Sequence, residues 1–173
     1  MMAQRVARVV ANGNRRCEMK IGLIVYSQTG HTLDVCEQLK DRYVAAGHEA
    51  VIERVTVVGE RTPQTKTFEL DAKPDAARYD AMVFASYVEA FSLCPVMNDY
   101  LKEIDSLEGK PTACLVTQQF PYPWMGGNRA LKQMKKLVDA KNGAVKGTAV
   151  VNWARSKRTA TTAAALEQLA SAF

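Results

Sequence analysis

A nearly continuous apolar run followed by a short polar loop is the feature that most constrains the fold. Residues 20–26 read Lys-Ile-Gly-Leu-Ile-Val-Tyr, a pattern typical of a parallel strand that is buried on both faces. The apolar residues after the loop recur at helical spacing: Leu33, Cys36, Leu39, Tyr43 and Val44. Gly47 stands where a helix of this length would be capped. Strand, loop and helix together predict the first half of a βαβ unit.

The rest of the chain alternates in the same way. Further strands are expected over residues 50–58, 80–86, 112–117 and 147–152. Helices are expected from Pro95, over 131–138 and over 159–173, while the proline-containing stretch 59–78 is expected to be irregular. This alternation predicts an α/β fold, a doubly wound five-stranded parallel sheet with helices on both faces. No repeat or linker divides residues 19–173, which we expect to form one domain.

Residues 1–18 differ in composition from the remainder of the chain, because they hold four Arg and a single Glu. A targeting peptide has a similar charge pattern, but this segment contains no Ser and no continuous apolar core. We favour an N-terminal extension ahead of a strand that opens at Met19. A chain lacking residues 1–18 is therefore expected to fold and to keep its binding properties.

Composition narrows the class of protein. The chain is 47% hydrophobic and 24% charged, and no apolar run approaches the roughly 20 residues that span a bilayer. Cys17, Cys36, Cys94 and Cys114 form no C-x-x-C pair, which argues against a zinc site, an iron–sulfur cluster or a disulfide framework. For Cys94, packing is favoured over reactivity. We expect a cytoplasmic protein without a membrane span.

Positive charge is concentrated late in the chain. Residues 129–158 hold nine Lys or Arg against the single Asp139, although the whole chain carries a net charge of only +5. A solvated helix surface is the favoured interpretation. The functional alternative is a docking face for an anionic protein or for a dinucleotide phosphate. No nucleic-acid motif accompanies the charge, so a nucleic-acid partner is not expected.

The loop after the first strand is the strongest functional signal. It reads Ser27-Gln28-Thr29-Gly30-His31-Thr32 and leads directly into the predicted helix. Unpaired N–H groups at a helix N-terminus bind anions, hydroxyl side chains add donors, and glycine permits a positive φ. The chain has no G-x-x-x-x-G-K-[ST] pattern, which argues against a nucleotide triphosphatase. An ordinary turn with Ser27 or Thr32 as helix cap is the weaker alternative.

The segment 19–32 resembles the opening of flavodoxins, whose first loop follows a T/S-x-T-G-x-T pattern and binds the phosphate of FMN. The resemblance in layout extends from Met19 to the C-terminus and is that of a short-chain member. It implies strand order 2-1-3-4-5, with FMN bound at the switch point between strands 1 and 3. In this chain, residues 27–32 would hold the phosphate.

The same resemblance places the flavin ring between the loops after the third and fourth strands. The candidate residues of the first loop are Ser86, Tyr87, Val88, Glu89, Ala90 and Phe91. Those of the second are Thr117, Gln118, Gln119, Phe120, Tyr122, Trp124, Gly126 and Gly127. Tyr87 and Trp124 are the first candidates for ring neighbours, and Asn128 is a candidate cap of the next helix.

One stretch departs from the family pattern. Flavodoxins often carry a G-S-P-V-W/Y-like run after strand three, whereas residues 85–89 read Ala-Ser-Tyr-Val-Glu. The departure removes the proline and the last aromatic. Glu89 is expected to face solvent, and beside a flavin it would disfavour the anionic reduced form. His31 is expected to be exposed. Residues 152–157 follow the fifth strand and are expected to be ordinary surface, with contact to a second ligand as the alternative.

Three functions remain open at this point. The favoured one is an electron-transfer flavoprotein that works with a redox partner protein. The second is an FMN-dependent oxidoreductase that passes electrons from NAD(P)H to a quinone-type acceptor; the basic segment supports it and the short loops argue against it. The third is a module of the same fold that binds a protein partner without flavin.

Overall fold

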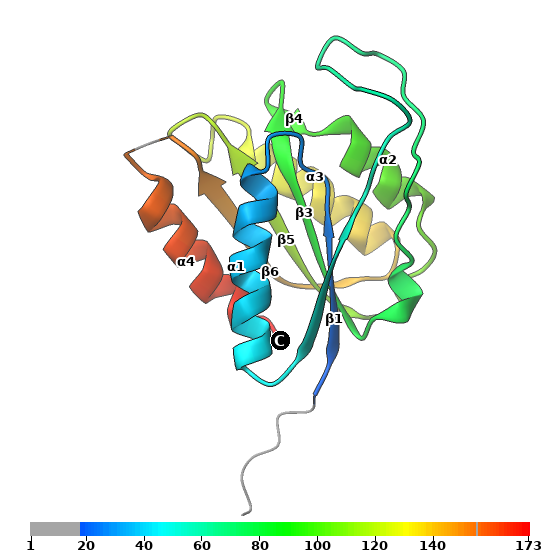
Figure 1. Cartoon of the computed structure of the whole chain (residues 1–173), viewed down its shortest axis with the longest axis vertical. Helices are drawn as coiled ribbons and strands as arrows, with labels where there is room; N and C mark the ends of the chain where they lie inside the picture. The colour runs from blue at the N-terminus through cyan, green and yellow to red at the C-terminus, as the bar shows by residue number, and fades with distance from the viewer. Residues whose placement is uncertain (1–17, 155) are drawn as a thin grey trace, which may run out of the picture.

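The computed structural model describes residues 18–154 and 156–173, and strands and helices alternate along them (Figure 1). The strands are β1 (Lys20–Val25), β2 (Glu49–Arg54), β3 (Ala81–Glu89), β4 (Ser92–Leu93), β5 (Pro111–Gln118) and β6 (Ala144–Asn152). The helices are α1 (His31–Ala45), the short 3-10 helix η1 (Ala76–Arg78), α2 (Pro95–Glu103), α3 (Gly127–Ala140) and α4 (Arg158–Ala170).

Five parallel strands form the sheet in the order β2-β1-β3-β5-β6, and the short β4 pairs antiparallel to the end of β3. β1 is an interior strand: Ile21 lies opposite Ala50 of β2 on one side and Ala81 of β3 on the other. Because a strand in this place has a strand on each side and helices on both faces, its buried residues 21–25 are apolar. The predicted fold class and strand order are confirmed.

The helices cover the sheet from both sides and build two cores (Figure 1). Leu23 and Val25 of β1 point to the face covered by α1 and α4, where Leu39 and Leu166 pack. The intervening Ile24 points to the opposite face, which α2 and α3 cover. Because the five main strands are parallel, their carboxyl ends all lie at one edge of the sheet. The long connection 59–78 extends from this edge (Figure 1).

Several predicted boundaries need correction. β2 ends at Arg54 rather than at residue 58, because the chain then leaves β1 and Val58 donates its N–H to Glu69. β3 continues three residues beyond the prediction, to Glu89. β6 begins at Ala144 rather than at residue 147, with an irregular register opposite Thr112 and Ala113.

Two further predictions concern the ends of elements. α1 closes as predicted, with Gly47 at φ 93° just beyond it. Asn128 does not cap α3, because that helix already begins at Gly127 and is preceded by Gly126 without a side-chain cap. The predicted extension lies outside the described residues except for Glu18. Among the helices of residues 18–154 and 156–173, none is long and apolar enough to cross a membrane.

Candidate functional site

The loop 27–32 follows the carboxyl end of β1. On one side of β1 lies β2, and on the other lies β3, from which the sheet continues to β5 and β6. In doubly wound folds this switch point opens a crevice at the carboxyl edge. Gly30 has a φ of 87° and immediately precedes α1. This left-handed conformation costs a residue with a side chain about 1–2 kcal/mol, so the glycine is required by the turn itself.

The backbone of this loop presents unused donors. The Gly30 N–H is bonded to Ser27 Oγ at 3.1 Å, and Asp34 is the first residue of α1 whose N–H reaches a loop carbonyl, that of Gly30. No hydrogen bond links the N–H groups of His31 and Thr32 to any residue the structure describes. Such groups carry the positive end of the helix dipole and favour an anion.

A cavity of about 170 Å³ opens beside this loop. The predicted site residues that line it are Gln28, Thr29, His31, Thr32, Tyr87, Val88, Thr117, Gln118 and Gln119. Across its floor, Thr32 Oγ1 and Thr117 Oγ1 lie 2.8 Å apart, which joins the first turn of α1 to the end of β5. The structure thus brings the three predicted loops together at one place.

Other predicted residues lie away from the cavity walls. Phe91 stacks on Phe120 with ring centres 5.1 Å apart, and Tyr122 stacks on Trp124 at 6.0 Å. All four rings are exposed, and Trp124 retains 73% of its accessible surface. The remaining predicted residues that do not line the cavity are Ser27, Gly30, Ser86, Glu89, Ala90, Gly126 and Gly127.

The segment after residue 86, predicted as a loop, instead extends β3 and turns back as a tight hairpin with β4. Val88 and Glu89 belong to β3, Ala90 and Phe91 turn at positive φ, and β4 returns alongside. Gly126 packs against this hairpin so closely that a Cβ there would lie 2.7 Å from Val88 and 2.9 Å from the Phe91 backbone. The hairpin and the loop before α3 are therefore in direct contact.

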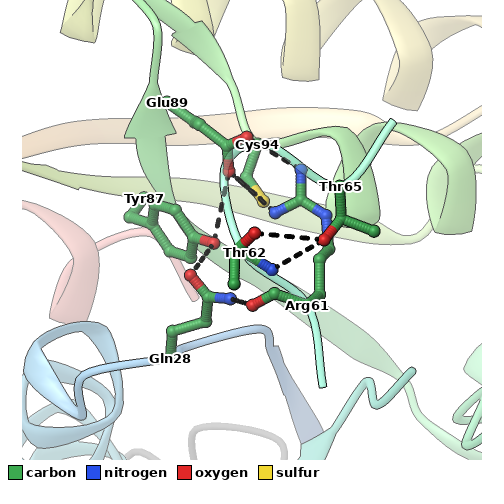
Figure 2. Close-up of polar contacts among 7 residues, drawn as sticks. All are labelled: Gln28, Arg61, Thr62, Thr65, Tyr87, Glu89 and Cys94. Carbon is green, nitrogen blue, oxygen red and sulfur yellow. Dashed lines mark hydrogen bonds and ion pairs between the residues drawn. The ribbon is translucent and has the colours of Figure 1, made fainter. Parts of the chain in front are cut away.

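Glu89 does not face solvent, which corrects the sequence-based expectation. Its carboxylate accepts hydrogen bonds from both terminal nitrogens of Arg61, at 2.8 and 2.9 Å (Figure 2). Only 12% of the Glu89 side chain and 2% of the Arg61 side chain are exposed. The hydrogen bonds from Arg61 lower the pKa of Glu89. Burial raises the pKa of the neighbouring Cys94 thiol, which lies 3.6 Å from Glu89 and is buried as predicted.

Trp153 is a wall of the cavity that sequence reasoning missed by assigning residues 152–157 to the surface. Its ring stacks on His31 at 4.4 Å, and the Arg158 guanidinium lies 4.4 Å from the same ring. His31 is consequently half-buried rather than exposed. Desolvation, together with the charge of Arg158, lowers the His31 pKa. The position of Trp153 directly after a predicted strand was the available signal.

The polar atoms of the cavity fit a phosphate-bearing aromatic ligand such as FMN. The free amides of His31 and Thr32 and the hydroxyl of Thr29 suit a phosphate, and Tyr87 and Trp153 supply aromatic walls. Gln118 donates to the carbonyls of Phe120 and Tyr122, and its Oε1 is buried close to Gly127 without a hydrogen-bond partner among the described residues. In the described residues, no cluster of three His, Cys, Asp or Glu side chains is placed to hold a metal.

A doubly wound parallel sheet with a glycine-containing loop and a helix N-terminus at its switch point defines a class of folds, and solved structures specify which member of the class this is. Flavodoxin 2 from Bacillus cereus has a TM-score of 0.64 and 19% identity, with 88% of this chain and 96% of that one covered. Reduced flavodoxin from Megasphaera elsdenii has a TM-score of 0.63, 15% identity and the same coverage. The Trp repressor binding protein from Bacillus subtilis has a TM-score of 0.56 and 10% identity, covering 89% and 99%.

The chain therefore has the flavodoxin-like fold. No protein-family model matches the sequence, and neither does any curated protein. At these identities the likeness establishes the fold, and function must be argued from the site itself.

Proposed function

We propose that this protein binds FMN at the carboxyl edge of its sheet and transfers electrons to or from a partner protein. The observation that carries the proposal is the loop 27–32, in which Gly30 turns at positive φ and the next two residues, His31 and Thr32, have free amides and line the cavity. Bound FMN would supply one- and two-electron chemistry. The protein's part is to hold the phosphate through residues 27–32 and to enclose the flavin with Tyr87, Gln118 and Trp153.

The phosphate assignment predicts a strong preference among flavins. FMN is expected to bind at least about 100-fold more tightly than riboflavin, because hydrogen bonds to a charged group contribute roughly 1.5–3 kcal/mol each. FAD is expected to bind less tightly than FMN, since its phosphate is not terminal. Fluorescence titration of the apoprotein with the three flavins measures this. Equal affinity for riboflavin would refute the phosphate site, and no affinity for any flavin would favour a module that binds only a protein partner.

The surface of α3 supports an anionic partner. Ala130, Met134 and Val138 face the core, while the opposite face exposes the basic residues Arg129, Lys132, Lys135 and Lys136. The helix begins next to the exposed aromatic rings of the preceding loop, where the Lys157 amine lies 4.7 Å from the centre of the Tyr122 ring. Cations steer an acidic protein to this edge and aromatic rings provide contact area.

Charge reversal on α3 tests this partner. Replacing Lys132, Lys135 and Lys136 by Glu is expected to slow association with an acidic ferredoxin-type donor by about 10-fold at low salt, with the difference shrinking as salt rises. The flavin spectrum should not change. Stopped-flow reduction across a salt series measures the rate, and reversal of Lys40, Lys66 and Lys102 elsewhere on the surface is the control. Equal slowing by both triple variants would contradict a docking face on α3.

An FMN-dependent NAD(P)H oxidoreductase is the second candidate, because Arg158 and the ring of Trp153 lie next to the cavity. It predicts that NADPH alone reduces the flavoprotein at ordinary enzymatic rates, with NADH the poorer donor. We expect slow direct reduction by both nucleotides. Rapid turnover with NADPH and a quinone, without a protein donor, would favour the enzyme.

A further inference from the structure

A closed ring of hydrogen bonds connects three separate segments at the edge of the cavity (Figure 2). Gln28 of the phosphate loop donates to the carbonyl of Arg61, whose guanidinium holds Glu89 of β3. Tyr87 completes the ring, because its hydroxyl lies 2.8 Å from Gln28 Oε1 and 3.4 Å from Glu89 Oε2. Both polar atoms of the Gln28 side chain are thereby engaged, although the residue lies at the surface.

The side of the loop that faces β2 is held by a second contact. Arg54, the last residue of β2, donates to the carbonyl of Ser27 at 3.0 Å. Thr62 comes directly after Arg61 and bonds to Thr65, which closes a turn at the start of the long connection 59–78. The first two residues of the phosphate loop are thus attached to the end of β2 and to the connection beyond it.

The ion pair between Arg61 and Glu89 is expected to contribute little net stability, but it fixes the relative positions of the two side chains. Removing Arg61 and Glu89 from water opposes their attraction, so apolar residues of similar size often stabilise a fold as well as a buried pair does. A bidentate guanidinium–carboxylate contact fixes both distance and orientation. The Arg61 guanidinium also lies 5.3 Å from the Phe68 ring, which holds it from the side of the connection.

We propose that Arg61 and Glu89 are positioning residues that preorganise the phosphate loop, acting through Gln28 and Tyr87. They do not contact the ligand in this role, since neither lines the cavity. Their effect on FMN affinity rests on the proposed function, whereas their effect on the loop does not. Fixing a flexible side chain before binding contributes to affinity, and two such side chains correspond to about 10-fold or more.

The test is the double variant Arg61→Met/Glu89→Leu, which removes both charges and keeps apolar volume. We expect a melting temperature close to that of the wild type and FMN binding about 10-fold weaker. In the flavin-free protein, the Gly30 amide should exchange about 10-fold faster, because its bond to Ser27 Oγ depends on loop geometry. The matched control is Lys73→Met/Glu103→Leu, which removes an exposed ion pair of 3.1 Å and should change none of these quantities.

Wild-type exchange at Gly30 together with wild-type FMN affinity in the double variant would overturn the positioning role. If the wild type binds no flavin, the proposed function fails, while the exchange comparison still decides the role of the pair. If the double variant does not fold, Gln28→Ala replaces it, since it cuts the link and leaves the buried pair intact. Faster Gly30 exchange is expected there too, and unchanged exchange would refute the proposal.

Discussion

Replacing Gly30 by valine is expected to lower FMN affinity by about 100-fold or more while the fold persists. The residue has a φ of 87°, where a β-branched side chain is strained by about 1–2 kcal/mol. Relief of that strain would turn the loop amides away from the phosphate, and the loss of two charge-assisted hydrogen bonds accounts for roughly 3–6 kcal/mol. Flavin titration and urea unfolding of the same variant separate binding from stability.

Gly47→Val provides a matched control. Gly47 has a φ of 93° and, like Gly30, no atoms within 4 Å of an added Cβ, but it lies beyond the other end of α1. The two variants should lose similar stability, and only Gly30→Val should lose affinity. A Gly30→Val protein with wild-type affinity, or an equal loss of affinity in Gly47→Val, would show that the loop does not hold the phosphate.

The second large effect concerns stability. Glu89→Leu alone is expected to lower the free energy of unfolding by about 3–5 kcal/mol, because it leaves the Arg61 guanidinium buried without its carboxylate. Urea unfolding measures the loss. Adding Arg61→Met should restore most of it, and a double variant as unstable as the single one would contradict this account.

The same pair predicts a dependence on acid. Because the pKa of Glu89 is lowered in the fold, ionisation of its carboxyl favours the folded state. That contribution is fully present above the ordinary glutamate pKa of about 4.3 and is lost as the pH falls through the lowered value. The stability gap between wild type and Glu89→Leu should therefore narrow in acid. A gap that stays constant from pH 7 to the acid limit would argue against an ionised Glu89.

The fold was predictable because its signals are local. The buried run of β1 and the helical spacing of α1 each identify an element within a few residues, and their alternation along the chain specifies a parallel sheet. The loop 27–32 was predictable for the same reason, since a helix N-terminus preceded by glycine is contained in one short segment. Its binding of FMN remains a proposal.

What could not be predicted depends on contacts between distant segments. Arg61 and Glu89 are 28 residues apart, and neither belongs to a periodic pattern, so an exposed glutamate was the natural expectation. The stacking of Trp153 on His31 likewise requires β6 to end beside α1. Phe120 stacks on Phe91 of the β3–β4 hairpin, and Tyr122 stacks on Trp124, so these rings do not line the cavity. Composition gives no indication of these pairings.

The place of β1 in the sheet also bears on how the chain acquires its structure. Ile21 of β1 pairs with Ala81 of β3, 60 residues further along the chain, so the pairing of these two strands has to wait until β2 and the whole connection 59–78 have formed. Closing loops of that length is slow compared with forming helices. Until β3 arrives, one edge of the apolar residues 21–25 of β1 stays unpaired, and we expect newly made chains to be most prone to aggregate during that interval.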